Sequence, residues 1–159
     1  MPDGGNYSAG RKKPARGVQI HLEQPNWVWT SVCTANRSAW LAHEMMHRML
    51  QETWAKANHW LVADYIIMPD HTHFFAAPYE IEYDFDQWVS YWTGQLSRLH
   101  RNPDWRWQSH PFHRRLRHGE SYTAKWNYLR ENPVRKGLVK SSDEWPFQGR
   151  IFDIIWQGD

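Results

Sequence analysis

"MPDHTHFFAAP", residues 68–78, places two histidines one residue apart in a run that otherwise has the composition of a strand. The preceding residues 60–68, "WLVADYIIM", are also strand-like, and the Pro-Asp pair at Pro69 favours a turn between the two runs. We therefore expect an antiparallel hairpin. Because side chains alternate along a strand, His71 and His73 would share one face, with their Cα atoms about 7 Å apart. Both imidazoles could then bind one metal ion, although His-x-His arises easily by chance among ten histidines in 159 residues.

The segment before this hairpin predicts a strand and a helix. Residues 27–35, "WVWTSVCTA", are rich in β-branched and aromatic residues, which favours a strand. A helix would follow, with Asn36 or Ser38 as its capping residue. Its apolar positions recur at helical spacing and comprise Leu41, Met45, Met49, Leu50 and Trp54.

Two further helices are expected after the hairpin. Asp84 or Asp86 opens the first, which has one apolar face. The second covers residues 121–131, because Pro133 disfavours helical geometry at the residue before it and Gly137 can close the following turn. This order of elements predicts an α+β protein, a ferredoxin-like sandwich whose central antiparallel sheet has helices packed mainly on one face.

Length and composition favour one globular domain. We expect residues 1–20 to form a basic, flexible N-terminal arm and residues 21–159 to form the domain. No run approaches the ~18 consecutive apolar residues of a membrane span, and no signal peptide begins the chain, so we expect a cytoplasmic protein without a membrane partner. The lone cysteine, Cys33, excludes an internal disulfide.

Basic residues are concentrated in one half of the chain. Residues 98–140 contain eleven Lys and Arg against three acidic residues, and tryptophans lie among them. This mixture favours phosphate contacts with stacking surfaces between them, although a solvated basic face would have the same composition. The candidate DNA-binding residues of this half are Arg98, Arg101, Arg106, Arg114, Arg115, Arg117, Lys125, Arg130, Arg135 and Lys136. A second group lies in the N-terminal arm and comprises Arg11, Lys12, Lys13 and Arg16.

A second candidate metal motif is "HEMMH", residues 43–47, which has the HExxH form of a zinc metalloprotease helix. On a helix, His43 and His47 would share a face and Glu44 could act on a bound water. No HxxGxxH extension supplies a third ligand. We therefore favour an exposed polar stripe over a zinc site.

Tyr128 and Asn132 stand four residues apart and would share one helical face. A phenol and an amide oxygen could then meet the same metal ion. From the residues alone, the more common roles are a core or rim aromatic for Tyr128 and a helix terminator before proline for Asn132. Arg130, Arg135 and Lys136 crowd the end of this helix and could hold an anion there.

Four stretches of the sequence together resemble the REP-associated tyrosine transposases, a branch of the single-tyrosine HUH (IS200-like) transposase family. They are "WTSVCTANR", "IIMPDHTHFF", "WRWQSHPFHRRLRHGESYTAKWNYLRENPVRKGLV" and "WPF", in this order. The resemblance covers roughly residues 27–147. This chain departs from the family at Thr72, where a bulky apolar residue is usual between the histidines.

The resemblance implies an enzyme, an HUH-type endonuclease and strand transferase. Its metal ligands would be His71, His73 and Asn132, its nucleophile Tyr128, and its cofactor a divalent ion, Mg²⁺ or Mn²⁺. The tyrosine would attack a DNA phosphate and form a covalent 5′-phosphotyrosine intermediate, leaving a free 3′ hydroxyl.

The resemblance also implies the substrate, which would be single-stranded DNA folded into a hairpin of the REP type. No obligatory protein partner is evident, and such enzymes act as monomers or homodimers. Two alternatives stay open: a domesticated module that binds hairpin DNA or RNA without efficient cleavage, and the HExxH zinc metalloprotease.

Overall fold

The computed structural model describes residues 20–21, 27–79, 83–109, 112–115 and 121–155, and for residues 20, 21, 112–115 and 155 it describes the backbone alone. The strands are β1 (Ile20–His21), β2 (Val28–Cys33), β3 (Trp60–Ile67), β4 (His71–Pro78), β5 (Phe112–Arg115), β6 (Gln148–Arg150) and β7 (Ile154–Ile155). The α-helices are α1 (Glu44–Lys56), α2 (Phe85–His100), α3 (Tyr122–Leu129) and α4 (Asn132–Arg135). Within this part of the chain, no helix has the length and apolarity needed to cross a membrane.

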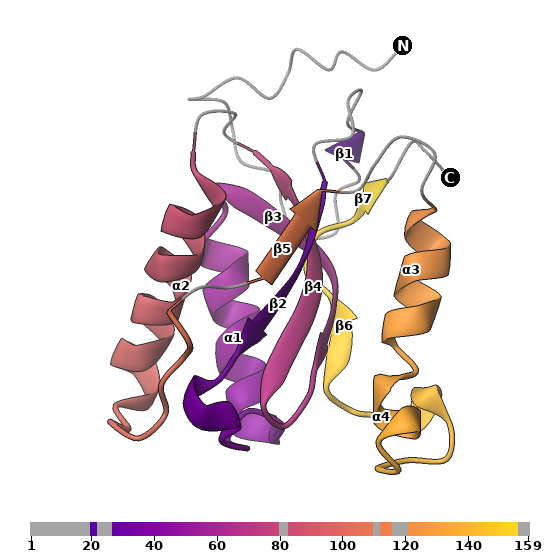
Figure 1. Cartoon of the computed structure of the whole chain (residues 1–159). Coiled ribbons are helices and arrows are strands. Elements are labelled where there is room, and N and C mark those ends of the chain that lie inside the picture. Colours follow the sequence, from indigo (N-terminus) through magenta and orange to yellow (C-terminus); the bar gives the residue numbers. More distant parts are fainter. Residues whose placement is uncertain (1–19, 22–26, 80–82, 110–111, 116–120, 156–159) are drawn as a thin grey trace.

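A five-stranded antiparallel sheet forms the centre of the molecule, in the order β5-β2-β4-β3-β6 (Figure 1). The elements β2, α1, β3, β4, α2 and β5 follow the βαββαβ order of a ferredoxin-like fold, and β6 extends the sheet beside β3. The predicted hairpin is β3–β4, and it places His73 between Ser31 of β2 and Ile66 of β3. The predicted fold class is confirmed. A separate parallel pair joins β1 to β7.

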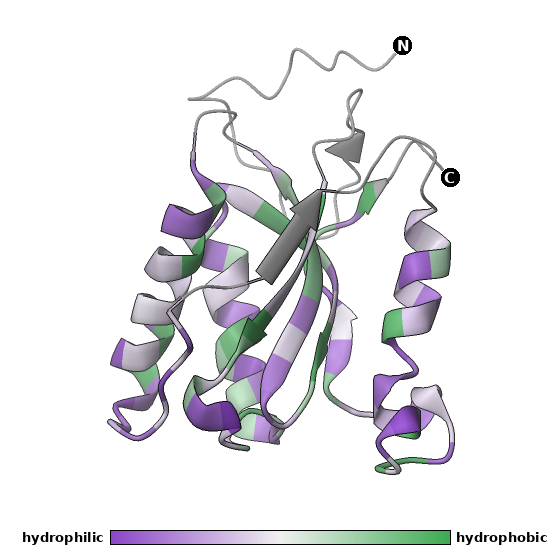
Figure 2. Ribbon diagram, in the orientation of Figure 1, coloured by the Kyte–Doolittle hydropathy of each residue, from purple (hydrophilic) through white to green (hydrophobic). Residues whose placement is uncertain are grey.

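Helices cover the two faces of the sheet unequally. The long helices α1 and α2 lie on one face, where Trp54 and Trp92 pack against Phe74 of β4. The short helix α3 lies on the other face, where Tyr122 packs against Phe75, with ring centroids 4.2 Å apart. Because side chains alternate along β4, the histidines share the α3 face with Phe75, as the sequence predicts. Figure 2 shows β4 changing from hydrophilic residues at its first end to hydrophobic residues farther along.

The first helix begins later than the sequence predicts. Neither Asn36 nor Ser38 caps it: Asn36 adopts a positive φ of 56° in a short 3₁₀ helix, and α1 starts at Glu44 with His43 as its cap. Asparagine tolerates this left-handed conformation better than most residues, which explains the turn. The buried face consists of Met46, Leu50, Thr53 and Trp54, whereas Met45, which was predicted on the apolar face, is exposed.

The third predicted helix, residues 121–131, is α3, which is capped by Ser121 and ends at Leu129. A further short helix that was not predicted, α4, begins at Asn132. Pro133 does not end a helix; it lies in the first turn of α4, where its missing N–H costs no hydrogen bond. Gly137 closes α4 with a φ of 72°, as expected.

Candidate active site

His71 and His73 lie side by side on the α3 face of the central strand β4. Their ring centroids are 4.7 Å apart and the rings stand at 78° to each other. His71 is 8% exposed. Because β4 is hydrogen-bonded on both edges, to β2 and to β3, the backbone holds the two rings in fixed positions.

Asp70, in the hairpin turn, orients the ring of His71. The Nδ1 atom of His71 lies 2.7 Å from Asp70 Oδ1, and Arg37 Nε donates to the other carboxylate oxygen at 2.9 Å. Burial lowers the pKa of His71 in spite of the adjacent carboxylate, so the ring is neutral and its Nδ1–H donates to Asp70. Partial burial raises the pKa of Asp70, but the hydrogen bonds from Arg37 and His71 outweigh it and leave the pKa below its usual value. His71 Nε2 is thereby left unprotonated, the form that binds metal.

His73 is also held neutral. Burial and the neighbouring His71 lower the pKa of His73 to about 3. A hydrogen bond between this ring and the backbone of Thr30 opposes the shift without outweighing it. The neutral imidazole is the form that binds a metal ion. Thr72, between the histidines, is fully buried and its hydroxyl lacks a hydrogen-bond partner.

Tyr128 and Asn132 are joined by a third residue, Arg135. Tyr128 is 63% exposed near the end of α3, and the guanidinium of Arg135 lies over its ring, 4.2 Å from the centroid. Arg135 Nη2 also donates to Asn132 Oδ1 at 2.6 Å. The positive charge of Arg135 is one of the lesser causes of the lowered pKa of His73, so it acts across the space between α4 and β4. The sequence predicts Arg135 as one of the DNA-binding residues and as one of three cations at the end of this helix, but it does not predict these two contacts.

Helix α3, which carries Tyr128, is held in place by its first residue, Tyr122. The Tyr122 hydroxyl donates to Asp64 Oδ2 at 2.7 Å, and the backbone N–H of Asp64 donates to the same hydroxyl oxygen at 3.2 Å. Arg150 of β6 binds both carboxylate oxygens of Asp64, at 3.1 and 2.9 Å. Burial raises the pKa of Tyr122 well above its usual value, which makes it a poor nucleophile and a good anchor. Only the three-dimensional fold brings these three residues together.

The HEMMH motif forms contacts of a structural kind. His43 is the cap of α1, and its Nδ1 accepts a hydrogen bond from the backbone N–H of Met46 at 3.3 Å. His47 Nε2 lies 2.7 Å from the hydroxyl of Tyr65, and burial lowers the pKa of His47. Both histidines are half-buried, so they do not form the exposed stripe that the sequence suggests. Because His43 Nδ1 accepts a hydrogen bond, the ring proton is on Nε2, and the Nε2 atom of His47 is occupied by the Tyr65 hydroxyl; both facts argue against a zinc site.

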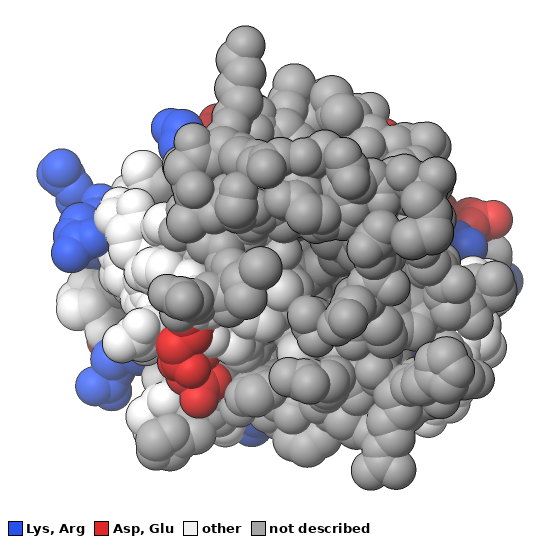
Figure 3. Space-filling view, turned by 90° about the horizontal axis from the view of Figure 1, so that it is seen from above, with Lys and Arg blue, Asp and Glu red and all other residues white. Residues whose placement is uncertain are grey.

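The structure divides the predicted basic half between two places. Arg98 and Arg101 are exposed at the end of α2, which covers the face of the sheet away from the histidines, and Arg106 is exposed in the segment after α2. In Figure 3 several Lys and Arg side chains stand along the edge of the molecule that is the α2 side of Figure 1. Arg106 lines a groove of about 320 Å³ between α2 and the following segment.

The remaining described basic residues lie on α3 and α4, the histidine side. Lys125 lies 4.7 Å from the centroid of the Trp29 ring, and Arg130 forms an ion pair with Asp143. Arg135 and Lys136 are exposed. The side chains of Arg114 and Arg115 in β5 lie outside the described residues, as do Arg11, Lys12, Lys13, Arg16 and Arg117 altogether.

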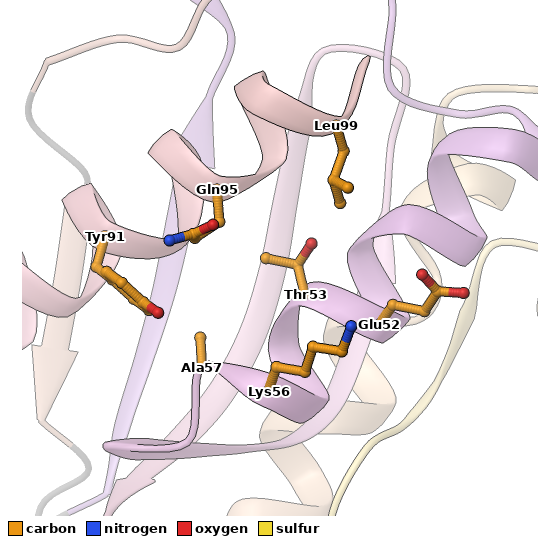
Figure 4. Close-up of a pocket in the computed structure, with 7 residues that line it drawn as sticks. All are labelled: Glu52, Thr53, Lys56, Ala57, Tyr91, Gln95 and Leu99. Atoms are coloured by element: carbon orange, nitrogen blue, oxygen red, sulfur yellow. The ribbon is translucent and has the colours of Figure 1, made fainter. Parts of the chain in front are cut away.

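A small hollow lies between the two long helices. It measures about 150 Å³ and is lined by residues of both, among them Thr53, Lys56, Tyr91 and Gln95 (Figure 4). It belongs to the helices that cover the face away from His71. None of the predicted metal ligands or the predicted nucleophile lines it.

The protein has a ferredoxin-like sheet with a His-x-His pair on the central strand β4 and, on the same face, the helix α3 that carries Tyr128. Comparison with solved structures finds a similar fold in a REP-associated tyrosine transposase bound to a REP hairpin: the TM-score is 0.68 and the identity 21%, over 86% of this chain and 82% of that one. A proposed transposase from Deinococcus radiodurans is also similar, with a TM-score of 0.46 and 18% identity over 76% of this chain and 97% of that one.

The structural comparison confirms the resemblance seen in the sequence motifs: the protein has the fold of a REP-associated tyrosine transposase. No known family profile and no curated protein matches the sequence.

Proposed function

We propose that this protein is a transposase-like enzyme, dependent on a divalent metal, that nicks single-stranded DNA and transfers the cut strand through a covalent tyrosine intermediate at Tyr128. The observation that carries the proposal is the position of α3, which bears the exposed Tyr128 and packs on the face of the sheet to which His71 and His73 point. The shared fold with a REP-associated tyrosine transposase supports it.

The histidine pair fits a divalent ion. Asp70 leaves His71 Nε2 free to coordinate, and the neutral ring of His73 lies beside that of His71, with the ring centroids 4.7 Å apart. Among the described residues, no group of three His, Cys, Asp or Glu side chains could hold a metal. A further ligand must therefore be of another type, and Asn132 Oδ1 is the candidate, with Mg²⁺ or Mn²⁺ as the ion. When bound, the metal would polarise the scissile phosphate.

The reaction assigned to Tyr128 is a transesterification. The phenolic oxygen forms a bond to phosphorus and gives up its proton to the solvent, while the bond between phosphorus and the 3′ oxygen breaks and that oxygen takes up a proton. The product is a 5′-phosphotyrosine and a free 3′ hydroxyl, so the phosphodiester energy is kept for a later joining step. Attack requires an accessible tyrosine, which the 63% exposure of Tyr128 supports.

The proposed substrate is hairpin DNA with a single-stranded extension. Arg135 and Lys136 at α4 could contact the phosphate at the cleavage position, and Lys125 beside Trp29 offers a cation next to an aromatic ring. Binding should weaken with salt, with a log–log slope of about −0.7 for each single-strand phosphate contact. The cations near Arg98 lie on the opposite side and would contact a more distant part of the DNA.

The direct test is incubation with labelled single-stranded hairpin DNA and Mn²⁺, followed by a denaturing gel. We expect a protein-linked DNA band that disappears in Tyr128→Phe, which keeps the ring and loses the nucleophilic oxygen. Hairpin affinity should change by less than about tenfold. Tyr91→Phe is the matched control, because Tyr91 is also an exposed tyrosine, on α2, and its removal should leave the band unchanged.

An adduct that persists in Tyr128→Phe would place the nucleophile elsewhere. Hairpin binding without any adduct in the wild-type protein would instead identify a DNA-binding module that does not cleave.

A further inference from the structure

Arg135 is hydrogen-bonded to the amide oxygen of Asn132, which is one of the proposed metal ligands. Its Nη2 donates to Asn132 Oδ1 at 2.6 Å, and the guanidinium covers one face of the Tyr128 ring at 4.2 Å. The hydrogen bond also fixes the orientation of the Asn132 amide, because a guanidinium can pair with the amide oxygen but not with the amide nitrogen. A single cation thus contacts the proposed nucleophile and a proposed ligand at once.

A divalent metal and Arg135 are competitors for this oxygen. The oxygen cannot donate electron density fully to both, and the positive charges of the metal and the guanidinium repel each other. Arg135 is exposed and lies on the four-residue helix α4, so its long side chain can swing away without unpacking the core. A DNA phosphate is the partner that would draw it away, because guanidinium groups bind phosphate in a bidentate manner.

We propose that in the free protein the guanidinium of Arg135 blocks Asn132 Oδ1. A DNA phosphate then draws the guanidinium away, so that this oxygen can bind the divalent metal. The inference rests on the proposed function, since it requires His71 and His73 to hold that metal. Its consequence is reciprocal: DNA raises the affinity for the metal, and the metal raises the affinity for DNA by the same factor. The site would then bind its metal tightly only when DNA is bound.

The test is a Mn²⁺ titration followed by electron paramagnetic resonance of the free ion, which needs no turnover. It uses the full chain with Tyr128→Phe, so that DNA stays intact while the ring under Arg135 is kept. In this background we expect hairpin DNA to raise the Mn²⁺ affinity by about fivefold or more. In Arg135→Ala we expect affinity without DNA to rise by a similar factor, and DNA to add little.

Lys140→Ala is the matched control. Lys140 is also an exposed cation, in the segment that follows α4, and it is not among the candidate DNA-binding residues. We expect its Mn²⁺ affinity to stay within about twofold of the parent and its response to DNA to persist, because Arg135 keeps its hydrogen bond to Asn132 Oδ1 in this variant. Arg135→Gln, which keeps much of the side-chain length, should behave as Arg135→Ala does.

Three results would overturn the inference: unchanged or weaker Mn²⁺ binding in Arg135→Ala, an equal gain in Lys140→Ala, or no effect of DNA in the parent. A failure of the proposed function has a different signature. Mn²⁺ binding that survives replacement of both His71 and His73 by Gln would show that these histidines do not hold the metal, whatever Arg135 does.

Discussion

The chain contains two pairs of histidines at metal-binding spacing, and the folded protein treats them differently. In α1, His43 caps the helix through Nδ1 and His47 contacts the Tyr65 hydroxyl through Nε2. In β4, the rings of His71 and His73 adjoin each other, and a carboxylate turns one of them so that its second nitrogen is free. Spacing is therefore a weak indicator of a metal site, and the commitments of the ring nitrogens are a stronger one.

The largest expected difference between the pairs is in DNA cleavage. Replacing both His71 and His73 by Gln should reduce Mn²⁺-dependent cleavage of hairpin DNA by about 10³-fold, because several kcal/mol of charge stabilisation would be lost. Replacing both His43 and His47 by Gln should leave cleavage within about threefold. Gel assays at a temperature at which both variants are folded measure this. A reversal of the two results would restore the HExxH alternative.

Removing the carboxylate that orients His71 should have an intermediate effect. In Asp70→Ala, Arg37 Nη2, 3.4 Å from His71 Nδ1, becomes the partner of that nitrogen and donates to it. The proton then moves to Nε2, and Mn²⁺ affinity should fall by about 10- to 100-fold. Asp143→Asn, which removes a carboxylate paired with Arg130 instead, serves as the control in the same titration. Equal affinities in the two variants would show that Asp70 has no orienting role.

The pairs should also differ in how they couple stability to pH. Because the pKa of His73 is lowered to about 3, the unfolded chain binds a proton below pH 6.5 that the folded protein does not bind. The free energy of unfolding should therefore fall with falling pH across this window, by about 1.4 kcal/mol per pH unit from His73, and the effect should vanish above pH 6.5. Denaturant unfolding with a chelator present measures the slope.

His73→Gln should flatten this slope more than His47→Gln does, since burial lowers the pKa of His47 as well but leaves that ring half-exposed to solvent. The same slope in both variants would contradict the burial assigned to His73.

The smallest expected effect concerns the residue between the two strand histidines. Thr72 is fully buried with an unpaired hydroxyl, so Thr72→Val should leave stability unchanged or raise it by up to about 1 kcal/mol. Thr34, also fully buried, donates to the carbonyls of Ser38 and Asp70 at 2.8 and 3.1 Å. Thr34→Val should therefore lose about 1–2 kcal/mol. Thermal unfolding distinguishes the two, and an equal loss in both would reveal a partner for the Thr72 hydroxyl.

The sequence predicted those parts of the fold that rest on local periodicity. The hairpin, the face shared by His71 and His73 and the presence of three helices all follow from alternation or helical spacing. The short strands β5 and β6 were not predicted, because four and three residues carry too little periodicity to be distinguished from loops. The start of α1 was also wrong, since a left-handed turn at Asn36 leaves no clear pattern.

The candidate site was only partly accessible from the sequence. Ligand types and the exposed tyrosine could be proposed from motifs, but the contacts of Arg135 depend on how α4 follows α3. The count of charges along the chain likewise assigned Arg98 and Arg135 to one basic region. In the structure, the sheet separates α2, which carries Arg98, from α4, which carries Arg135. Contacts between residues far apart in sequence, such as Asp64 with Tyr122 and Arg150, are properties of the fold and have no local signal.

The irregularity in β3 leaves one backbone amide, that of Asp64, whose hydrogen bond depends on the position of α3. Between Val62 and Tyr65 the pairing with β4 shifts by one residue, and the amide of Asp64 binds the Tyr122 hydroxyl instead of the neighbouring strand. Exchange of that amide proton with solvent deuterium therefore depends on release of α3, while amides paired within the sheet exchange only when the sheet opens. Protection of one proton thus records how often the helix that carries Tyr128 leaves its place.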